Sequence, residues 1–206
     1  MSQFGEMEAV DPIAYFVEDK YTVRRKVLKL FGGAFHVYNG IGEVVLYSKM
    51  KAFKLKEDIR LYTDEGMATE LLRISARSVI DLGATYDVVD SASGEVIGAL
   101  RRKAMKSILK DEWVILDEGG HEIGLIKEDS TFKAFARRFV EFVSIFLPQQ
   151  YHVEMGGRQV AVMKQNFNPF VYKINVDFSV DTEYALDRRL GMAAMILLAA
   201  IEGKQG

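Results

Sequence analysis

The positively charged side chains of this sequence occur in clusters, and they are the residues most suited to binding an anionic ligand. Five of them fall within ten residues, at Arg101, Arg102, Lys103, Lys106 and Lys110, between two predicted strands. Guanidinium groups make forked contacts with phosphate oxygens, and ammonium groups add point charges. We therefore take Arg101, Arg102, Lys103 and Lys106 as candidate ligand-binding residues for an anionic headgroup. The alternative is that these charges, like the clusters at residues 24–26 and 49–56, only solvate the outer face of the fold.

The residue types that most often catalyse reactions do not occur in the sequence motifs of known catalytic sites. His36 and His152 each follow an aromatic residue that opens a predicted hairpin, and His121 falls in a predicted turn. The sequence contains no His-x-x-x-His pair, no Gly-x-Ser-x-Gly motif and no phosphate-binding Gly-Lys-Ser/Thr loop. We therefore predict a protein that is not an enzyme, without catalytic residues, metal or cofactor.

Composition narrows the class of protein further. At 206 residues and 49% hydrophobic content the chain suffices for one domain with a large core. Lys and Arg number 27 against 29 Asp and Glu, so no overall basic field would draw it to nucleic acid. The absence of cysteine excludes disulfides and thiolate metal sites. Residues 1–12 lack the pattern of a signal peptide, and we expect a cytoplasmic protein.

An internal repeat predicts antiparallel hairpins. Each copy opens on an aromatic residue, alternates into a turn that contains Gly, and leaves through a second alternating run. The four copies begin at Phe35, Tyr86, Trp113 and Tyr151. A fifth hairpin is predicted over residues 59–76. Single strands over residues 21–29 and 170–176 bring the total to about twelve strands.

Two segments have helical spacing instead. Over residues 131–147 apolar side chains recur at helical intervals before Pro148, which predicts a helix that packs on the barrel. Residues 182–202 predict a second helix, capped by Asp181 or Thr182 and apolar on every face from Leu190 to Ile201. That apolar run is shorter than the ~20 residues that span a bilayer, so we expect it to be buried in the protein.

The strand count and the apolar helix predict one architecture. A barrel of eight strands is filled by its own side chains, whereas about twelve strands leave room for a helix ~10 Å across. We therefore predict a mainly β fold, an antiparallel β-barrel of about twelve strands closed around a central helix at residues 182–202. Residues 1–19 are expected to form an N-terminal, partly flexible extension, and residues 20–206 a single domain.

Several segments, in this order, resemble the tubby C-terminal-like superfamily, and within it the branch of LURP-one-related proteins and phospholipid scramblases. The closest segments are Tyr86–Asp90 with Gly94–Gly98, Leu100–Lys103 with Trp113, and Leu186–Leu190 followed by the apolar helix. The resemblance implies a twelve-stranded barrel threaded by a hydrophobic C-terminal helix. Its branches are similar to phosphoinositide-binding, lipid-moving or uncharacterised proteins, so it implies much less about function.

We expect a non-catalytic binding or structural module whose ligand is an anionic phospholipid headgroup or a protein partner, cytoplasmic or peripheral at a membrane surface. The alternative is a membrane-associated, scramblase-like protein. Scramblases resemble one another in an acidic stretch before the last strand, and the matching residues 163–170 contain no carboxylate. That departure argues against calcium-triggered scrambling.

Overall fold

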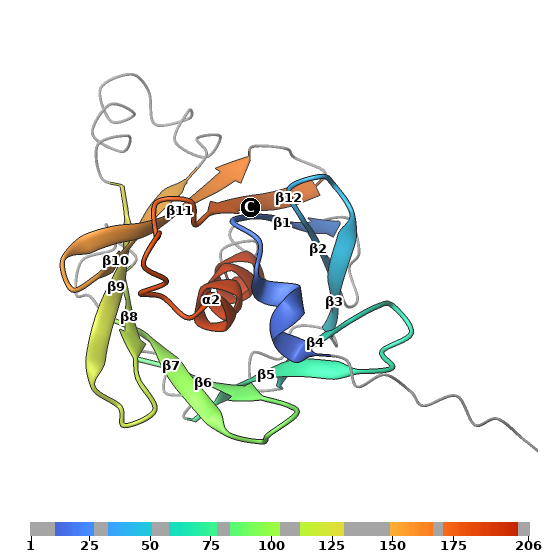
Figure 1. The fold of residues 1–206 in the computed structure, drawn as a ribbon, viewed down its shortest axis with the longest axis horizontal. Coiled ribbons are helices and arrows are strands. Elements are labelled where there is room, and N and C mark those ends of the chain that lie inside the picture. The colour runs from blue at the N-terminus through green and yellow to red at the C-terminus, as the bar shows by residue number, and fades with distance from the viewer. Residues whose placement is uncertain are drawn as a thin grey trace, which may run out of the picture.

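Twelve antiparallel strands close into a barrel in the computed structural model of the chain (Figure 1). The structure describes residues 11–26, 33–50, 58–77, 83–103, 112–129, 149–166 and 171–201. Each strand pairs with its neighbours in the sequence, and β1 pairs with β12 to close the ring, so the sheet has no free edge. The predicted closed barrel of about twelve strands with a C-terminal helix is confirmed.

The strands follow the predicted hairpins closely. Their bounds are β1 Lys20–Lys26, β2 Gly33–Tyr38, β3 Val44–Met50, β4 Ile59–Tyr62, β5 Glu70–Ala76, β6 Thr85–Asp90, β7 Val96–Arg102, β8 Glu112–Leu116, β9 Glu122–Glu128, β10 Gln150–Met155, β11 Arg158–Asn166 and β12 Val171–Asp177. All five predicted hairpins are therefore confirmed, and the two predicted single strands are β1 and β12. The helix predicted over residues 131–147 lies outside the described residues.

The repeat exists because each hairpin needs one buried aromatic residue and one tight turn. The four opening residues Phe35, Tyr86, Trp113 and Tyr151 are all buried in the core. In the turn between β6 and β7, Gly94 takes a positive φ of 77°, which costs glycine little. Asp90 steadies this turn, since its carboxylate accepts hydrogen bonds from the backbone N–H groups of Ala92 and Ser93.

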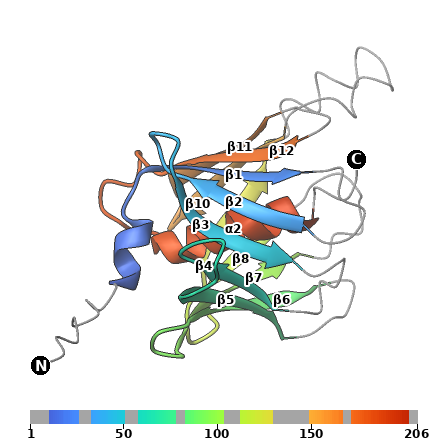
Figure 2. The same cartoon turned by 90° about the vertical axis from the view of Figure 1, so that its right-hand side faces the viewer.

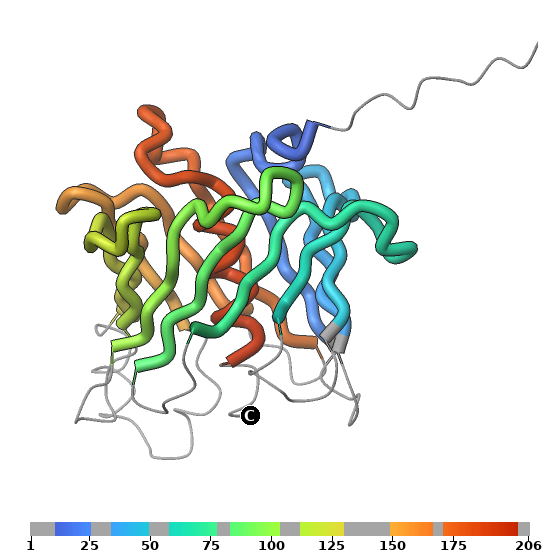
Figure 3. The backbone as a smooth tube through the Cα atoms, turned by 90° about the horizontal axis from the view of Figure 1, so that it is seen from below, coloured from blue at the N-terminus to red at the C-terminus, as the bar shows by residue number. Residues whose placement is uncertain are grey.

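The barrel has two unlike ends, which Figures 2 and 3 show from the side. The tight turns of the five hairpins lie at one end, which we call the turn end. The 3-10 helix η1 (Pro12–Phe16) and residues 178–187 lie at this end too. At the other end, the far end, β1 finishes at Lys26 and β12 begins at Val171. Helix η1 falls inside the predicted N-terminal extension, yet its Phe16 is buried in the core.

The C-terminal helix α2 (Arg188–Ile201) begins later than the predicted residue 182. The reason is local chemistry in the preceding turn. Asp181 does not cap a helix; its carboxylate accepts hydrogen bonds from the N–H groups of Ala185 and Leu186, and Tyr184 has a left-handed φ of 52° that no α-helix contains. Asp187 is the N-cap instead, because its Oδ1 accepts from the N–H of Arg189 at 2.8 Å.

Every residue of α2 except Arg189 is buried, and Figure 1 shows the helix inside the ring of strands. Small residues let it approach its neighbours. A Cβ atom on Gly191 would stand 2.6 Å from the Phe178 ring, which is closer than atoms can pack. Larger side chains such as Met192, Met195 and Ile196 fill the remaining space in the core cluster.

Charged side chains form hydrogen bonds and ion pairs at both ends of α2. At its start, the guanidinium of Arg188 bonds the Asp181 carboxylate at 2.9 Å, and both side chains are buried. Arg189 bonds Asp90 at 2.7 Å and so ties the helix to the β6–β7 turn. Near its end, buried Arg25 donates to the carbonyl oxygen of Ala199 at 3.3 Å. Burial lowers the pKa of Arg25, but guanidinium remains charged in proteins and complements the negative helix terminus.

Substitution of Met195 or Ile196 by Asp should abolish folding. Either change would bury an unpaired carboxylate, at a cost of several kcal/mol against a total stability of ~5–15 kcal/mol. Thermal unfolding followed by circular dichroism measures the loss, with Ile41→Asp as control because Ile41 is 81% exposed. A melting temperature near wild type for Met195→Asp would contradict the buried position of α2.

Asp181→Ala should destabilise the protein far more than Glu183→Ala. The first change removes the buried carboxylate that bonds the Arg188 guanidinium and leaves only Asp19, 3.7 Å away; breaking a buried pair costs about 3–5 kcal/mol. The second removes the partner of Arg158, and because both side chains of that pair are exposed, it should cost no more than about 1 kcal/mol. Chemical denaturation gives both values, and equal losses would show that the buried pair does not anchor the helix.

Candidate anion-binding surface

The three described residues of the predicted rim cluster, Arg101, Arg102 and Lys103, do not all lie on one face of the sheet. Arg101 and Arg102 are consecutive residues of β7, so their side chains leave opposite faces of the sheet. Arg102 is in register with the buried Trp113 and therefore lies on the inner face. Arg101 forms an ion pair with Glu122, and Lys103 bonds Glu112 at 2.6 Å. Lys106 lies outside the described residues, so the structure leaves the four-residue site as a prediction.

The second predicted cluster divides between the two faces of β1. Arg25 is one of the buried charged residues and serves the helix, whereas Arg24 is exposed on the outer face. The guanidinium carbon of Arg24 lies 5.4 Å from the centre of the Tyr38 ring, a cation–π distance. In the third cluster, Lys49 is exposed near the far end, and the residues after Met50 lie outside the described part of the chain.

A cationic surface forms instead across the outer faces of three neighbouring strands, from Arg24 on β1, Lys173 on β12 and Lys164 on β11. Arg24 stands directly opposite Lys173 in the β1–β12 pairing. In the β11–β12 pairing Lys164 faces Asn175, two residues along from Lys173 and on the same face. Within the described residues none of the three cations has a carboxylate partner. Like charges opposite one another destabilise a sheet, so an anion bound at this surface would relieve the repulsion.

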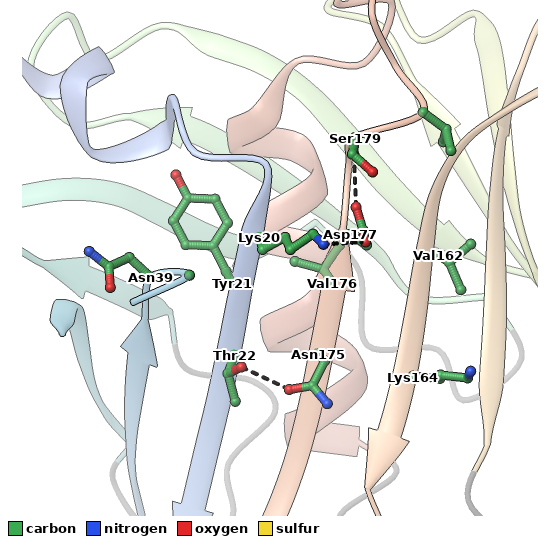
Figure 4. A pocket seen from close by; sticks show the side chains of 12 residues that line it. Lys20, Tyr21, Thr22, Asn39, Val162, Lys164, Asn175, Val176, Asp177 and Ser179 are labelled. Atoms are coloured by element: carbon green, nitrogen blue, oxygen red, sulfur yellow. Dashed lines mark hydrogen bonds and ion pairs between the residues drawn. The ribbon is translucent and has the colours of Figure 1, made fainter. Parts of the chain in front are cut away.

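A pocket of about 460 Å³ adjoins this surface, and Figure 4 shows its lining. Lys164 lines it together with Thr22 and Asn175, whose side chains share a hydrogen bond of 2.8 Å. Lys20 pairs with Asp177 at 3.3 Å inside the same pocket. Hydrogen bonds from Ser179, and the nearby Lys20, hold the pKa of Asp177 below its usual range. The pocket therefore offers one ion-paired lysine, one unpaired lysine and several neutral polar groups.

Charge is divided between the two ends of the barrel. The hairpin turns carry carboxylates, at Glu43, Asp64, Glu65, Glu95, Asp117 and Glu118. The described cations of the turn end all have carboxylate partners, in the pairs Lys20–Asp177, Arg158–Glu183, Arg188–Asp181 and Arg189–Asp90. Arg24, Lys49, Lys164 and Lys173, in the half of the barrel toward the far end, and Arg73, in the middle of β5, have none within the described residues. The unpaired cations of the described residues therefore lie on strands and not on the hairpin turns.

Lys164 and Lys173 are functional candidates that the sequence interpretation missed. Alternation along β11 and β12 places both on the outer face, and that much could have been predicted. Their proximity to Arg24 could not, because it depends on the closure of the barrel between its first and last strands.

The three histidines lie apart from one another, at surface hydrogen bonds. His36 lies 2.7 Å from Glu65, His121 3.1 Å from Asp117, and His152 2.8 Å from Gln159. Across the described ranges, no three His, Asp or Glu side chains come together in a way that could hold a metal ion. Nor is any helix of those ranges both long and apolar enough to cross a membrane.

A closed up-and-down barrel of twelve strands that is followed by a buried apolar helix defines the class of fold, and comparison of the sequence with protein-family models defines the family. The model of the LURP-one-related family matches residues 44–199, from β3 into α2. The chain therefore belongs to the LURP-one-related family, which agrees with the resemblance of its segments to tubby-like proteins. A search of curated proteins gives no match.

Lys173→Met should raise the melting temperature, because it removes one member of the like-charge pair with Arg24 and keeps the length of the side chain. The gain should be at most about 1 kcal/mol and should shrink in high salt, which screens the repulsion. Lys127→Met is the matched control, since Lys127 bonds Glu154 at 2.7 Å and should gain nothing. Equal shifts for the two variants would contradict the repulsion.

Proposed function

We propose that this LURP-one-related protein is a non-catalytic binding module that docks on anionic phospholipid surfaces. The observation that carries the proposal is the arrangement of Arg24, Lys173 and Lys164 on neighbouring strands without carboxylate partners among the described residues. A folded protein gains stability by separating or pairing such charges. Their retention side by side supports a role in which an external anion supplies the missing partner.

The chemistry of this surface suits phosphate. The Arg24 guanidinium can make forked hydrogen bonds to phosphate oxygens, and the two lysines add point charges. Asn175, whose Oδ1 accepts the Thr22 hydroxyl, provides its amide N–H groups as neutral donors beside Lys164. Near an anionic membrane each such cation contributes about 1 kcal/mol, so three of them amount to roughly a hundredfold in affinity.

Orientation follows from the distribution of charge. The carboxylates of the hairpin turns would be repelled by an anionic surface, whereas the unpaired cations would be attracted, so the half of the barrel toward the far end should face the lipid. The described rim residues Arg101, Arg102 and Lys103 lie in the same half. Together with Lys106 they form a secondary site in this proposal. Arg101 and Lys103 must first give up Glu122 and Glu112, which reduces what they can contribute.

The triple variant Arg24→Gln, Lys164→Gln, Lys173→Gln should lose most of its binding to vesicles of phosphatidylcholine with phosphatidylserine. Co-sedimentation over a range of salt concentrations measures both the affinity and its salt dependence, which the variant should flatten because fewer charges remain to be screened. The rim variant Arg101→Gln, Arg102→Gln, Lys103→Gln, Lys106→Gln is the matched control and should lose less. Melting temperatures should change little in either.

Two results would contradict the proposal in different ways. If wild-type protein ignores the anionic vesicles even at low salt, the lipid function is wrong. If it binds them and only the rim variant loses binding, the function stands and the surface is misassigned. Competition by the soluble headgroup glycerophosphoserine separates recognition of a single phosphate from attraction to the membrane field, which the soluble molecule does not reproduce.

A further inference from the structure

The turn end presents apolar side chains to solvent. All the large apolar residues that are exposed in the described part of the chain lie there. Four of them belong to two segments at the mouth of the barrel, η1 with the residue after it and residues 178–187 (Figure 1). We call these four the mouth patch: Ile13 and Val17 at η1, each 59% exposed, Val180, 53% exposed, and Tyr184, 69% exposed. Single exposed apolar residues need no explanation, but a group at one end of a domain is typical of an interaction surface.

Tyr184 is held in the patch at a conformational cost. Its φ of 52° lies in the left-handed region, where a side chain larger than that of Gly or Asn is strained. Gly would fit this turn without strain and without exposing an aromatic ring. The retention of an exposed tyrosine under these conditions indicates a role outside the folded domain, since such strain collects at binding and catalytic sites.

The patch is fixed in place by buried contacts beneath it. The Arg188 guanidinium lies 5.1 Å from the centre of the Tyr184 ring and 3.7 Å from the Asp19 carboxylate, so it links the two sides of the mouth. On the η1 side, the Tyr21 hydroxyl accepts the N–H of Glu18 and donates to the carbonyl oxygen of Tyr15. Burial raises the pKa of Tyr21 to about 12, so this hydroxyl keeps its proton. An anchor that is already ordered loses little entropy on binding.

The charge around the patch selects its partner. Asp11, Glu18, Asp19 and Glu183 border the four apolar residues. The nearby cations Arg188 and Arg158 pair with Asp181 and Glu183, and Arg188 also lies near Asp19. Asp11 and Glu18 have no cationic partner among the described residues. An anionic lipid surface would be repelled by this rim, whereas a positively charged protein segment would be attracted to it. Tyrosine is one of the residues that most often dominate the binding energy of protein interfaces.

We infer that the mouth patch binds a basic, apolar segment of a partner protein, with Tyr184 as its anchor and the surrounding carboxylates as its charge partners. This inference does not rest on lipid binding, because it uses none of the unpaired cations. Val180 is the one residue of the mouth patch that lines the same pocket as Lys164. If both hold, the protein connects a membrane surface to a basic protein.

The test uses the full chain and a short fluorescent peptide of Lys and Leu at helical spacing, with a second peptide in which Ser replaces Leu. Fluorescence anisotropy should show the Lys-Leu peptide binding more tightly than the Lys-Ser peptide. The double variant Tyr184→Gly, Val180→Ser should weaken the Lys-Leu peptide by about tenfold or more. Val96→Ser is the matched control, since Val96 is exposed at the same end but outside the mouth, and it should bind as wild type.

Stability separates this role from a structural one. If Tyr184 is an anchor held under strain, the Tyr184→Gly variant alone should melt at the same temperature as wild type or higher. A clear fall in melting temperature would show that the ring serves folding and would overturn the inference.

Equal affinity of the two peptides, or unchanged affinity in the double variant, would also overturn the inference. So would a wild-type dimer in size-exclusion chromatography that Tyr184→Gly dissociates, because a second copy would then be the occupant. Vesicle binding should be the same in all these variants, and its loss in the double variant would mean that the patch meets lipid.

Discussion

A helix without a polar face lies inside this protein, and the other features of the fold depend on its enclosure. Residues such as Met195 and Ile196 have no exposed surface, so water must be kept from α2 all the way round. A sheet can do this only as a closed ring, and the pairing of β1 with β12 closes it. The charged ends of the helix are the weak points of such a core, and Asp181, Asp90 and Arg25 satisfy them. Only the Asp181–Arg188 pair is fully buried, and because separating such a pair would leave an uncompensated charge, it holds the start of the helix in one position.

Because the interior is filled by α2, the surface is left to carry function. A barrel of this kind offers two kinds of surface for binding, the outer faces of its strands and its two ends. The distribution of charge makes these places unlike one another. Carboxylates at the turns leave the described cations of that end paired, while Arg24, Lys164 and Lys173 keep free charge on the other half of the barrel. A protein whose net charge is only −2 can therefore present a positive surface and a negative surface at the same time.

Much of the fold could be predicted from local patterns, and less of the candidate site. An aromatic residue followed by alternation and a Gly turn specifies a hairpin within some fifteen residues, which is why the copies at Phe35, Tyr86, Trp113 and Tyr151 were predictable. The start of α2 was not, since Asp181 serves an irregular turn with Tyr184 in a left-handed conformation. The partners of the described rim residues could not be predicted for a similar reason. Pairing of Arg101 with Glu122 and of Lys103 with Glu112 depends on the register of neighbouring strands, and the opposition of Arg24 and Lys173 depends on the first and last strands of the barrel meeting.

The claim that the two ends face different partners can be tested by the depth of single sites in a membrane. The chain contains no cysteine, so one can be introduced alone. Asn166→Cys places an environment-sensitive fluorophore on an exposed position near the far end, and Glu118→Cys places it on an exposed hairpin turn. With vesicles of phosphatidylcholine and phosphatidylserine, the emission of the label at residue 166 should shift to the blue and be quenched by brominated lipid, while that at residue 118 should not change. A response at residue 118 equal to or greater than that at residue 166 would contradict the account.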